Sequence, residues 1–130
     1  MTAGFRRCVA RLVPLAAVLV APFGHAHHSI GGEFDSSRQV TVDGVVREYK
    51  LINPHTYIVV AVQSERGSED WTLTFGPATK LIRGSGWNES TLKSGDRVTA
   101  TGRPARRGLG LYLAALTKAD GTILIDELEE

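Results

Sequence analysis

Three histidines are the residues of this 130-residue chain best suited to chemistry: the adjacent pair His27 and His28, and the distant His55. Cleavage after Ala26 would give His27 both an α-amino group and an imidazole, and these two nitrogens can close one chelate ring on a metal ion. A third nitrogen from His28 or His55 completes the tetragonal nitrogen set that copper(II) prefers. Alternatively, His28 binds copper(II) through the terminal amine, the intervening amide and its own ring, without His55. Both arrangements predict a copper(II) site at a free amino terminus.

The alternative for these histidines is a structural or incidental role. An amino terminus with two histidines binds copper in vitro whether or not the cell uses it. His55 follows the turn-forming pair Asn53-Pro54, where its ring could simply hydrogen-bond the carbonyl groups of that turn. Glu33 and Asp35 are the candidates to orient a ligating imidazole through its other ring nitrogen.

A basic, glycine-rich loop is the second candidate site. Arg103, Arg106 and Arg107 lie within the stretch GRPARRGLG at residues 102–110. An anion or a nucleic-acid backbone could lie against such a loop, although basic loops are more often solvated turns. Aromatic residues, which stack on bases, make up only 7% of the chain. The sequence therefore predicts an anion-binding loop here and no nucleic-acid partner.

Signatures of catalysis are absent from the sequence. No nucleophile has an assignable general base, no zinc motif has its usual spacing, and no glycine motif could cradle a phosphate. We therefore expect no enzyme. A small oxidative copper enzyme built on the chelate of His27 is the alternative.

The first 26 residues have the features of a secretory signal peptide. A basic start with three arginines precedes the apolar run at 12–23, and the small residues Gly24 and Ala26 precede the cleavage point. The run of 12 residues is shorter than the roughly 20 needed to span a bilayer. We expect a secreted, periplasmic protein with no membrane anchor in the mature chain.

Removal of the signal peptide also changes the chemistry that remains. Cys8 and Met1 are lost, so the mature chain has no sulfur ligand for copper(I), zinc or an iron–sulfur cluster. It keeps 12 basic and 14 acidic residues, a net charge of −2, whereas a nucleic-acid-binding domain is expected to be strongly basic. The metal site that remains possible for the mature chain is one built from nitrogen ligands. The expected partner is a metal ion or a periplasmic protein.

The pattern of the mature chain is typical of an all-β protein. Apolar patterning and turn residues predict six strands, at 39–51, 55–62, 71–75, 97–102, 111–117 and 122–126. The segment 55–62 is apolar on both faces, as in a strand through the middle of a barrel. A short helix is predicted at 77–83, between the third and fourth strands, with Gly84 as its stop and another helical turn at 87–92. Gly44 is expected to mark a bulge.

This order of elements is typical of the OB-fold, a small five-stranded barrel. An SH3-like barrel or an open sandwich is the alternative. Trp71 and Trp87 are expected in the core and its lid. We expect the signal peptide at 1–26, a mature N-terminal arm at 27–37, an OB-like β-barrel domain at 38–126 and an acidic tail at 127–130.

Several short motifs carry a resemblance to a known family: His27-His28-Ser29, Glu33-Phe34-Asp35, Asn53-Pro54-His55, Gly86-Trp87 and Leu92-Lys93-Ser94-Gly95-Asp96. With them the chain resembles an uncharacterised family of small exported bacterial proteins, a domain of unknown function. Ile30 replaces the phenylalanine that follows His-His-Ser in the family, and Gly108-Leu109-Gly110 has no firm counterpart. The resemblance implies a periplasmic location and a small β-barrel, and it implies no activity.

The sequence thus predicts an exported small β-barrel binding protein that holds copper(II) through its mature N-terminal histidine. The alternative is a periplasmic structural or interaction domain that binds a protein, peptide or glycan partner without a metal.

Overall fold

Alternating apolar side chains give the barrel strands one face in the core and one toward solvent. In β1 (Val40–Lys50) the buried residues are Val42 and Val46, and in β2 (Thr56–Ser64) Ile58 and Val60 are fully buried. The computed structural model describes residues 30–128. The predicted signal peptide, His27 and His28 lie outside the described residues.

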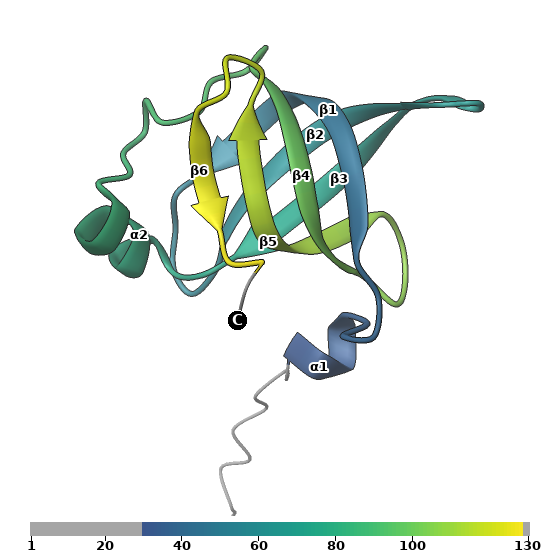
Figure 1. The fold of residues 1–130 in the computed structure, drawn as a ribbon, viewed down its shortest axis with the longest axis horizontal. Helices are drawn as coiled ribbons and strands as arrows, with labels where there is room; N and C mark the ends of the chain where they lie inside the picture. The colour runs from purple at the N-terminus through teal and green to yellow at the C-terminus, as the bar shows by residue number, and fades with distance from the viewer. Residues whose placement is uncertain (1–29, 129–130) are drawn as a thin grey trace, which may run out of the picture.

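The strands form one sheet that closes on itself. The remaining elements are α1 (Ile30–Glu33), β3 (Gly67–Phe75), α2 (Ala78–Ser85), β4 (Arg97–Pro104), β5 (Gly110–Lys118) and β6 (Ile123–Asp126). Neighbouring strands follow the order β3-β2-β1-β4-β5-β6, and a parallel pairing of β3 with β5 closes the first five strands into a barrel (Figure 1). β6 pairs with β5 alone. The predicted all-β, OB-like barrel with a helix between its third and fourth strands is confirmed.

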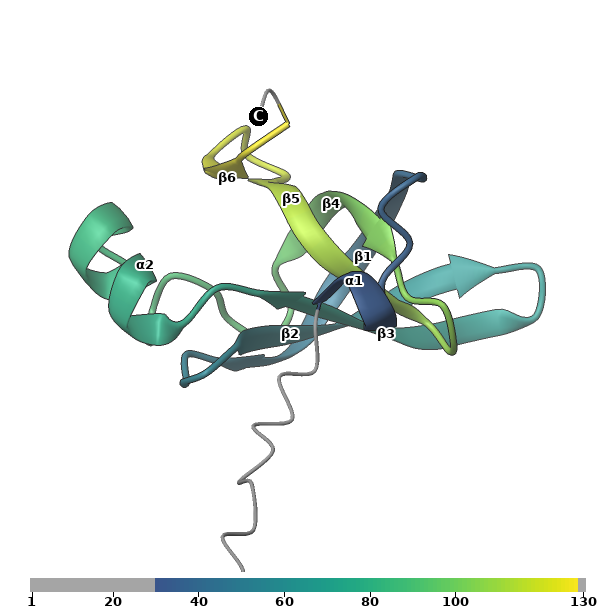
Figure 2. The ribbon, with the colours of Figure 1, turned by 90° about the horizontal axis from the view of Figure 1, so that it is seen from below.

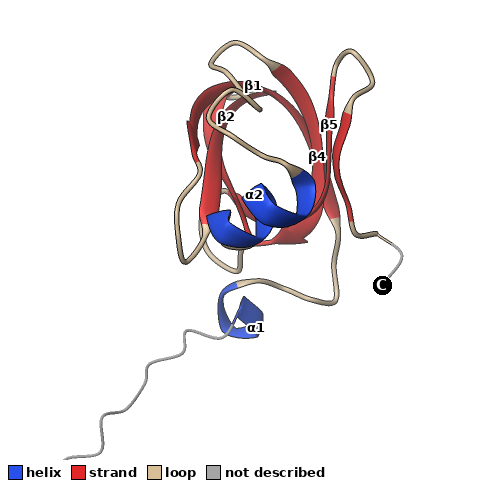
Figure 3. Ribbon diagram, turned by 90° about the vertical axis from the view of Figure 1, so that its left-hand side faces the viewer, coloured by secondary structure: helices blue, strands red, loops and turns tan. Residues whose placement is uncertain are grey.

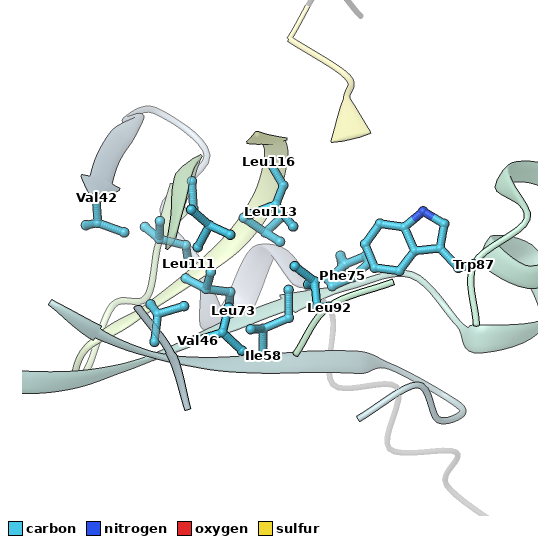
Figure 4. Packing of buried hydrophobic residues seen from close by; sticks show 13 residues of the cluster. Val42, Val46, Ile58, Leu73, Phe75, Trp87, Leu92, Leu111, Leu113 and Leu116 are labelled. Atoms are coloured by element: carbon cyan, nitrogen blue, oxygen red, sulfur yellow. The ribbon is translucent and has the colours of Figure 1, made fainter. Parts of the chain in front are cut away.

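The core fills the inside of this barrel. All five barrel strands contribute aliphatic side chains, among them Ile58, Leu73, Leu111 and Leu116, each with no exposed surface (Figure 4). Because no strand of the barrel can leave without exposing its inward face, core burial and barrel closure stabilise each other.

The helix α2 lies across one end of the barrel (Figure 3). Trp87, which follows α2, is 3% exposed, and its ring lies 5.2 Å from the ring of Phe75 and 6.1 Å from that of Tyr49. The Tyr49 hydroxyl donates to the Asn88 carbonyl at 3.1 Å. The expected lid tryptophan is therefore Trp87, while Trp71 packs partly buried against the core. Neither described helix is long and apolar enough to cross a membrane.

The end of α2 differs from the prediction. The helix continues through Gly84 to Ser85 and is capped by Gly86, whose φ of 68° is the left-handed conformation that favours glycine. The helical turn expected at 87–92 is absent. There the Asn88 side chain accepts from the Ser90 amide at 2.7 Å, and the Thr91 hydroxyl accepts from the Asn88 amide at 2.9 Å. These side-chain hydrogen bonds compete with the main-chain bonds of a helix.

The bulge in β1 also lies elsewhere than expected. The register with β2 shifts between Val46 and Glu48, not at Gly44. Beside the shift, Val46 exchanges two main-chain hydrogen bonds of 2.8 Å with the turn at Gly95 and Asp96 that leads into β4. Gly44 has a different role, because a Cβ there would lie 2.9 Å from the Ala61 carbonyl oxygen. The absence of a side chain at Gly44 allows β2 to lie close to β1.

Gly102 offers a test of the packing between β4 and β5. A Cβ at this position would clash with the Tyr112 carbonyl oxygen and lie 2.8 Å from its carbonyl carbon. We predict that Gly102→Ala lowers the free energy of unfolding by about 1–3 kcal/mol, because backbone atoms must shift. The measurement is the midpoint of urea unfolding, with the dependence of the unfolding free energy on urea concentration unchanged between the variant and the parent protein.

Gly84→Ala is the matched control. Nothing lies within 4 Å of its Cβ position in α2, so this change should raise the free energy of unfolding by roughly 0.5–1 kcal/mol. Equal midpoints for the two variants would contradict the packing described for Gly102.

Candidate functional site

The amino-terminal arm, whose described part is residues 30–37, is fastened to the loop between β4 and β5. Phe34 forms an antiparallel bridge with Ala105. The Asp35 amide donates to the Pro104 carbonyl and the Arg106 amide to the Glu33 carbonyl, both at 2.9 Å. The arm therefore continues the main-chain pairing beyond the end of β4, and arm and loop form one unit.

The Phe34 side chain adds an apolar anchor. Its ring lies 5.6 Å from the ring of Tyr112, a residue of β5 that faces outward between the buried Leu111 and Leu113. Only 9% of Phe34 is exposed. Partial burial, helped by the charge of Glu127, raises the pKa of the Tyr112 hydroxyl above its usual range. The arm thus covers an outer patch of the barrel where β5 begins (Figures 1 and 2).

A hollow of about 500 Å³ lies between α1 and the arginine loop, the name used here for residues 105–109. Its walls come from the arm and the loop alone: Gly32, Glu33, Phe34, Ala105, Arg106 and Arg107. Two of the three predicted anion-binding arginines are therefore brought together beside the arm. Arg103 lies outside the hollow, on β4 in register with Tyr112.

The charged residues that line the hollow are two arginines and one glutamate, Glu33. Among residues 30–128, no carboxylate forms an ion pair with Arg103, Arg106 or Arg107. The Asp35 carboxylate instead accepts from the Ser37 hydroxyl at 2.7 Å and from the Ser37 amide at 3.1 Å. These two hydrogen bonds, with the nearby guanidinium groups of Arg106 and Arg38, hold the pKa of Asp35 below its usual range.

His55 lies exposed at the start of β2, where it takes no part in holding the preceding turn. The buried Thr56 donates its amide to the Gly76 carbonyl at 3.1 Å and its hydroxyl to the Ile52 carbonyl at 3.4 Å. The Asn53 side chain accepts from the Thr79 amide at 3.3 Å. The His55 ring makes no hydrogen bond or ion pair with any described residue. The structural role considered for it is filled by its neighbours.

The strand register places His55 and the arm on one outer face of the barrel. Tyr57 pairs with Thr74 on β3, and Thr74 pairs with Tyr112 on β5. At the usual strand spacing, the Cα atoms of Tyr57 and Tyr112 are about 10 Å apart. Tyr57, Thr74 and Tyr112 thus form a row across three strands. Phe34 covers Tyr112 at one end of the row, and His55 lies two residues before Tyr57 at the other end.

A metal site cannot be assembled from the described residues alone. Residues 30–128 contain no group of three histidine, cysteine, aspartate or glutamate side chains positioned to hold a metal ion.

Sequence reasoning missed two residues of this unit, Phe34 and Tyr112. The helix α1 was also unexpected, because Gly31 and Gly32 are poor helix formers. A signal was available in the arm, where Phe34 is a single large apolar residue between Glu33 and Asp35. An isolated aromatic residue in a polar segment indicates that the segment packs against something.

Comparison with known proteins adds one match. The model of a family of unknown function, DUF6152, matches residues 15–113. The chain belongs to this family. The DUF6152 match includes the arm, the Asn53-Pro54-His55 motif and the arginine loop, and it confirms the resemblance that those motifs carried. No curated protein and no solved structure matches the chain significantly.

Phe34→Ala tests whether the ring holds the arm on the barrel. We predict that the amides of Asp35 and Arg106, which make the arm–loop bonds, exchange with solvent much faster in this variant, whereas the Thr56 amide is unchanged. The free energy of unfolding should fall by up to about 3 kcal/mol, because the Phe34 ring lies on the outer surface of the barrel. This value is the lower end of the range for replacing a buried phenylalanine by alanine.

Hydrogen exchange followed by NMR measures both effects. Ile82→Ala is the control, because Ile82 is 49% exposed on α2 and its loss should change stability by less than about 0.5 kcal/mol. Unchanged exchange at Asp35 and Arg106 in the Phe34 variant would show that the arm is held by other contacts.

Ser37→Ala tests the cause of the low Asp35 pKa. The variant loses the hydroxyl bond and keeps the amide bond, so the pKa should rise part of the way toward its ordinary value. Because the folded pKa lies below the unfolded one, the stabilisation is present above the unfolded pKa and is lost as pH falls through the folded pKa. The measurement is an NMR titration of the Asp35 carboxyl carbon.

Ser36→Ala, one residue away, serves as the control and should leave the titration unchanged. If Ser37→Ala and the parent protein titrate at the same pH, the hydroxyl bond does not control the pKa of Asp35.

Proposed function

We propose that this protein is an exported binding module of the periplasm that holds copper(II) through its mature N-terminal histidine, with the barrel as a scaffold. The docking of the arm is the observation that carries the proposal. His27 precedes Ile30, the first residue of α1, by three positions. A chelate at His27 is therefore attached to a segment that main-chain hydrogen bonds and the Phe34 ring fix to the barrel.

Such an anchor argues against an incidental copper site. An unanchored tail with two histidines binds copper without any contribution from the rest of the protein. Here residues 33–35 of the arm are held along the arginine loop, so ligands from the barrel can be presented close to the chelate. Preorganisation of this kind raises affinity because fewer conformations are lost on binding.

His55 is the candidate ligand from the barrel. It is exposed, it makes no bond to its own turn, and it opens the strand on the same outer face as the Tyr112 patch. A neutral imidazole nitrogen suits copper(II), and the only cysteine and methionine of the chain lie within the predicted signal peptide. His28 remains the alternative third ligand. Glu33 and Asp35 lie on the arm, close enough in sequence to His27 and His28 to orient a ring.

Copper(II) titration with electron paramagnetic resonance tests the proposal on protein exported and processed by the cell. We expect one tightly bound ion with a nitrogen-coordinated spectrum. One extra residue before His27 moves the amino group away from its ring, so this form should lose the tight site. A matched form with one extra residue after Glu130 should keep it. Identical weak binding in all three forms would favour the interaction domain with a protein, peptide or glycan partner.

His55→Ala and pH then define the ligands. If the third nitrogen comes from His55, the variant should bind copper at least about tenfold more weakly, with an altered spectrum. An unchanged affinity and spectrum would assign the third nitrogen to His28. Affinity should also fall steeply between about pH 8 and pH 5, because the imidazole and the α-amino group must both lose a proton to bind. Equal affinity at both ends of this range would exclude nitrogen chelation.

A further inference from the structure

Two arginines that are adjacent in the sequence, Arg106 and Arg107, line the hollow between the arm and the arginine loop. Arg106 and Arg107 are both exposed, and neither forms an ion pair with a described residue. Neighbouring positive charges repel each other, and an oxyanion placed between them would relieve this repulsion. Glu33 contributes to the opposite wall, and its carbonyl accepts from the Arg106 amide.

The backbone that carries the two arginines is held on both sides. Its first residue, Ala105, donates to the Gly110 carbonyl at 2.8 Å, and its last residue, Leu109, accepts from the Thr72 amide at 3.1 Å. The arm holds its middle through the Arg106 amide. The loop is therefore a fixed platform, which lowers the conformational cost of binding a ligand.

The hollow also has two apolar lining residues, Phe34 and Ala105. Phe34 and Ala105 form a continuous strip beside the arginines, because they are bridge partners in the short pairing of arm and loop. The volume of about 500 Å³ exceeds the needs of a bare inorganic ion and falls within the range of small-molecule sites. The hollow combines a cationic side for an anion with an apolar side for an organic stem.

We propose that this hollow is a binding site for a phosphate ester, with the phosphate on Arg106 and Arg107 and its organic stem against Phe34 and Ala105. One guanidinium fork satisfies both oxygens of a carboxylate. Two forks address three or more oxygens, which a tetrahedral phosphate offers and a carboxylate does not. The site is independent of copper and uses no histidine.

A phosphate ester of this kind can come from a soluble metabolite or from a lipid headgroup. Leu109, on the same loop, is 42% exposed and would enter the interface of a bilayer if the phosphate belonged to a lipid. The chemistry of recognition is the same in both cases, so the experiment has one arm for each source.

NMR titration of the processed, metal-free protein with glycerol 3-phosphate tests the soluble arm. We expect saturable shifts of the amides of residues 105–109, weaker binding of inorganic phosphate, which has no stem, and no saturable shift with acetate. Arg106→Gln and Arg107→Gln should each weaken binding of glycerol 3-phosphate about tenfold or more. Arg66→Gln removes the same charge from the β2–β3 turn and should change the affinity less than twofold.

Cosedimentation with phosphatidylglycerol vesicles tests the lipid arm with the same variants. Vesicle binding that Arg106→Gln and Arg107→Gln abolish, and that Arg66→Gln preserves, would assign the phosphate to a headgroup even without a response to glycerol 3-phosphate. Absence of binding in both arms would overturn the proposal, as would an equal loss in the Arg66 variant. Because the protein is metal-free, these outcomes do not depend on whether copper binds.

Discussion

Three residue pairs hold the barrel closed: Thr72 with Gly110, Leu73 with Leu111, and Thr74 with Tyr112. They are the only parallel pairing in a sheet whose other described pairings are antiparallel. Without this seam, Leu73 and Leu111 would lose the cover that leaves them with no exposed surface. The seam also fixes where β5 begins, and with it the end of the arginine loop and the outward position of Tyr112. The candidate sites thus depend on the same contacts as the core.

The barrel could be predicted because its signals are local. Alternation in β1 and β3 places Val42 and Leu73 inward, and a continuous apolar run marks β2. The turn residues between strands follow simple rules of turn chemistry. The features that were placed wrongly depend on contacts distant in the sequence. The β1 bulge lies beside Val46 because a turn nearly fifty residues later bonds to it, and no local pattern at Gly44 or Val46 reports that contact.

The candidate site was predictable in its residue types and not in its assembly. The sequence singles out Arg106, Arg107 and His55 as chemically distinctive. It cannot show that the first two share a hollow with Phe34 while His55 lies just before β2 on the same outer face. The association arises from the pairing of the arm with the β4–β5 loop, about seventy residues away. Two proposals, a copper site on the arm and a phosphate site beneath it, follow from this one association.

The sixth strand has a consequence for the behaviour of the protein at high concentration. β6 pairs with β5 along one edge only, so its other edge is unpaired in the described chain. An open edge is a template on which a second molecule can add a strand, and such additions propagate into aggregates. β6 has only four residues, and Asp126 and Glu127 place negative charge at its end. A second copy that approached this edge would meet too few bonding groups and a like charge, so the molecule resists strand addition at β6.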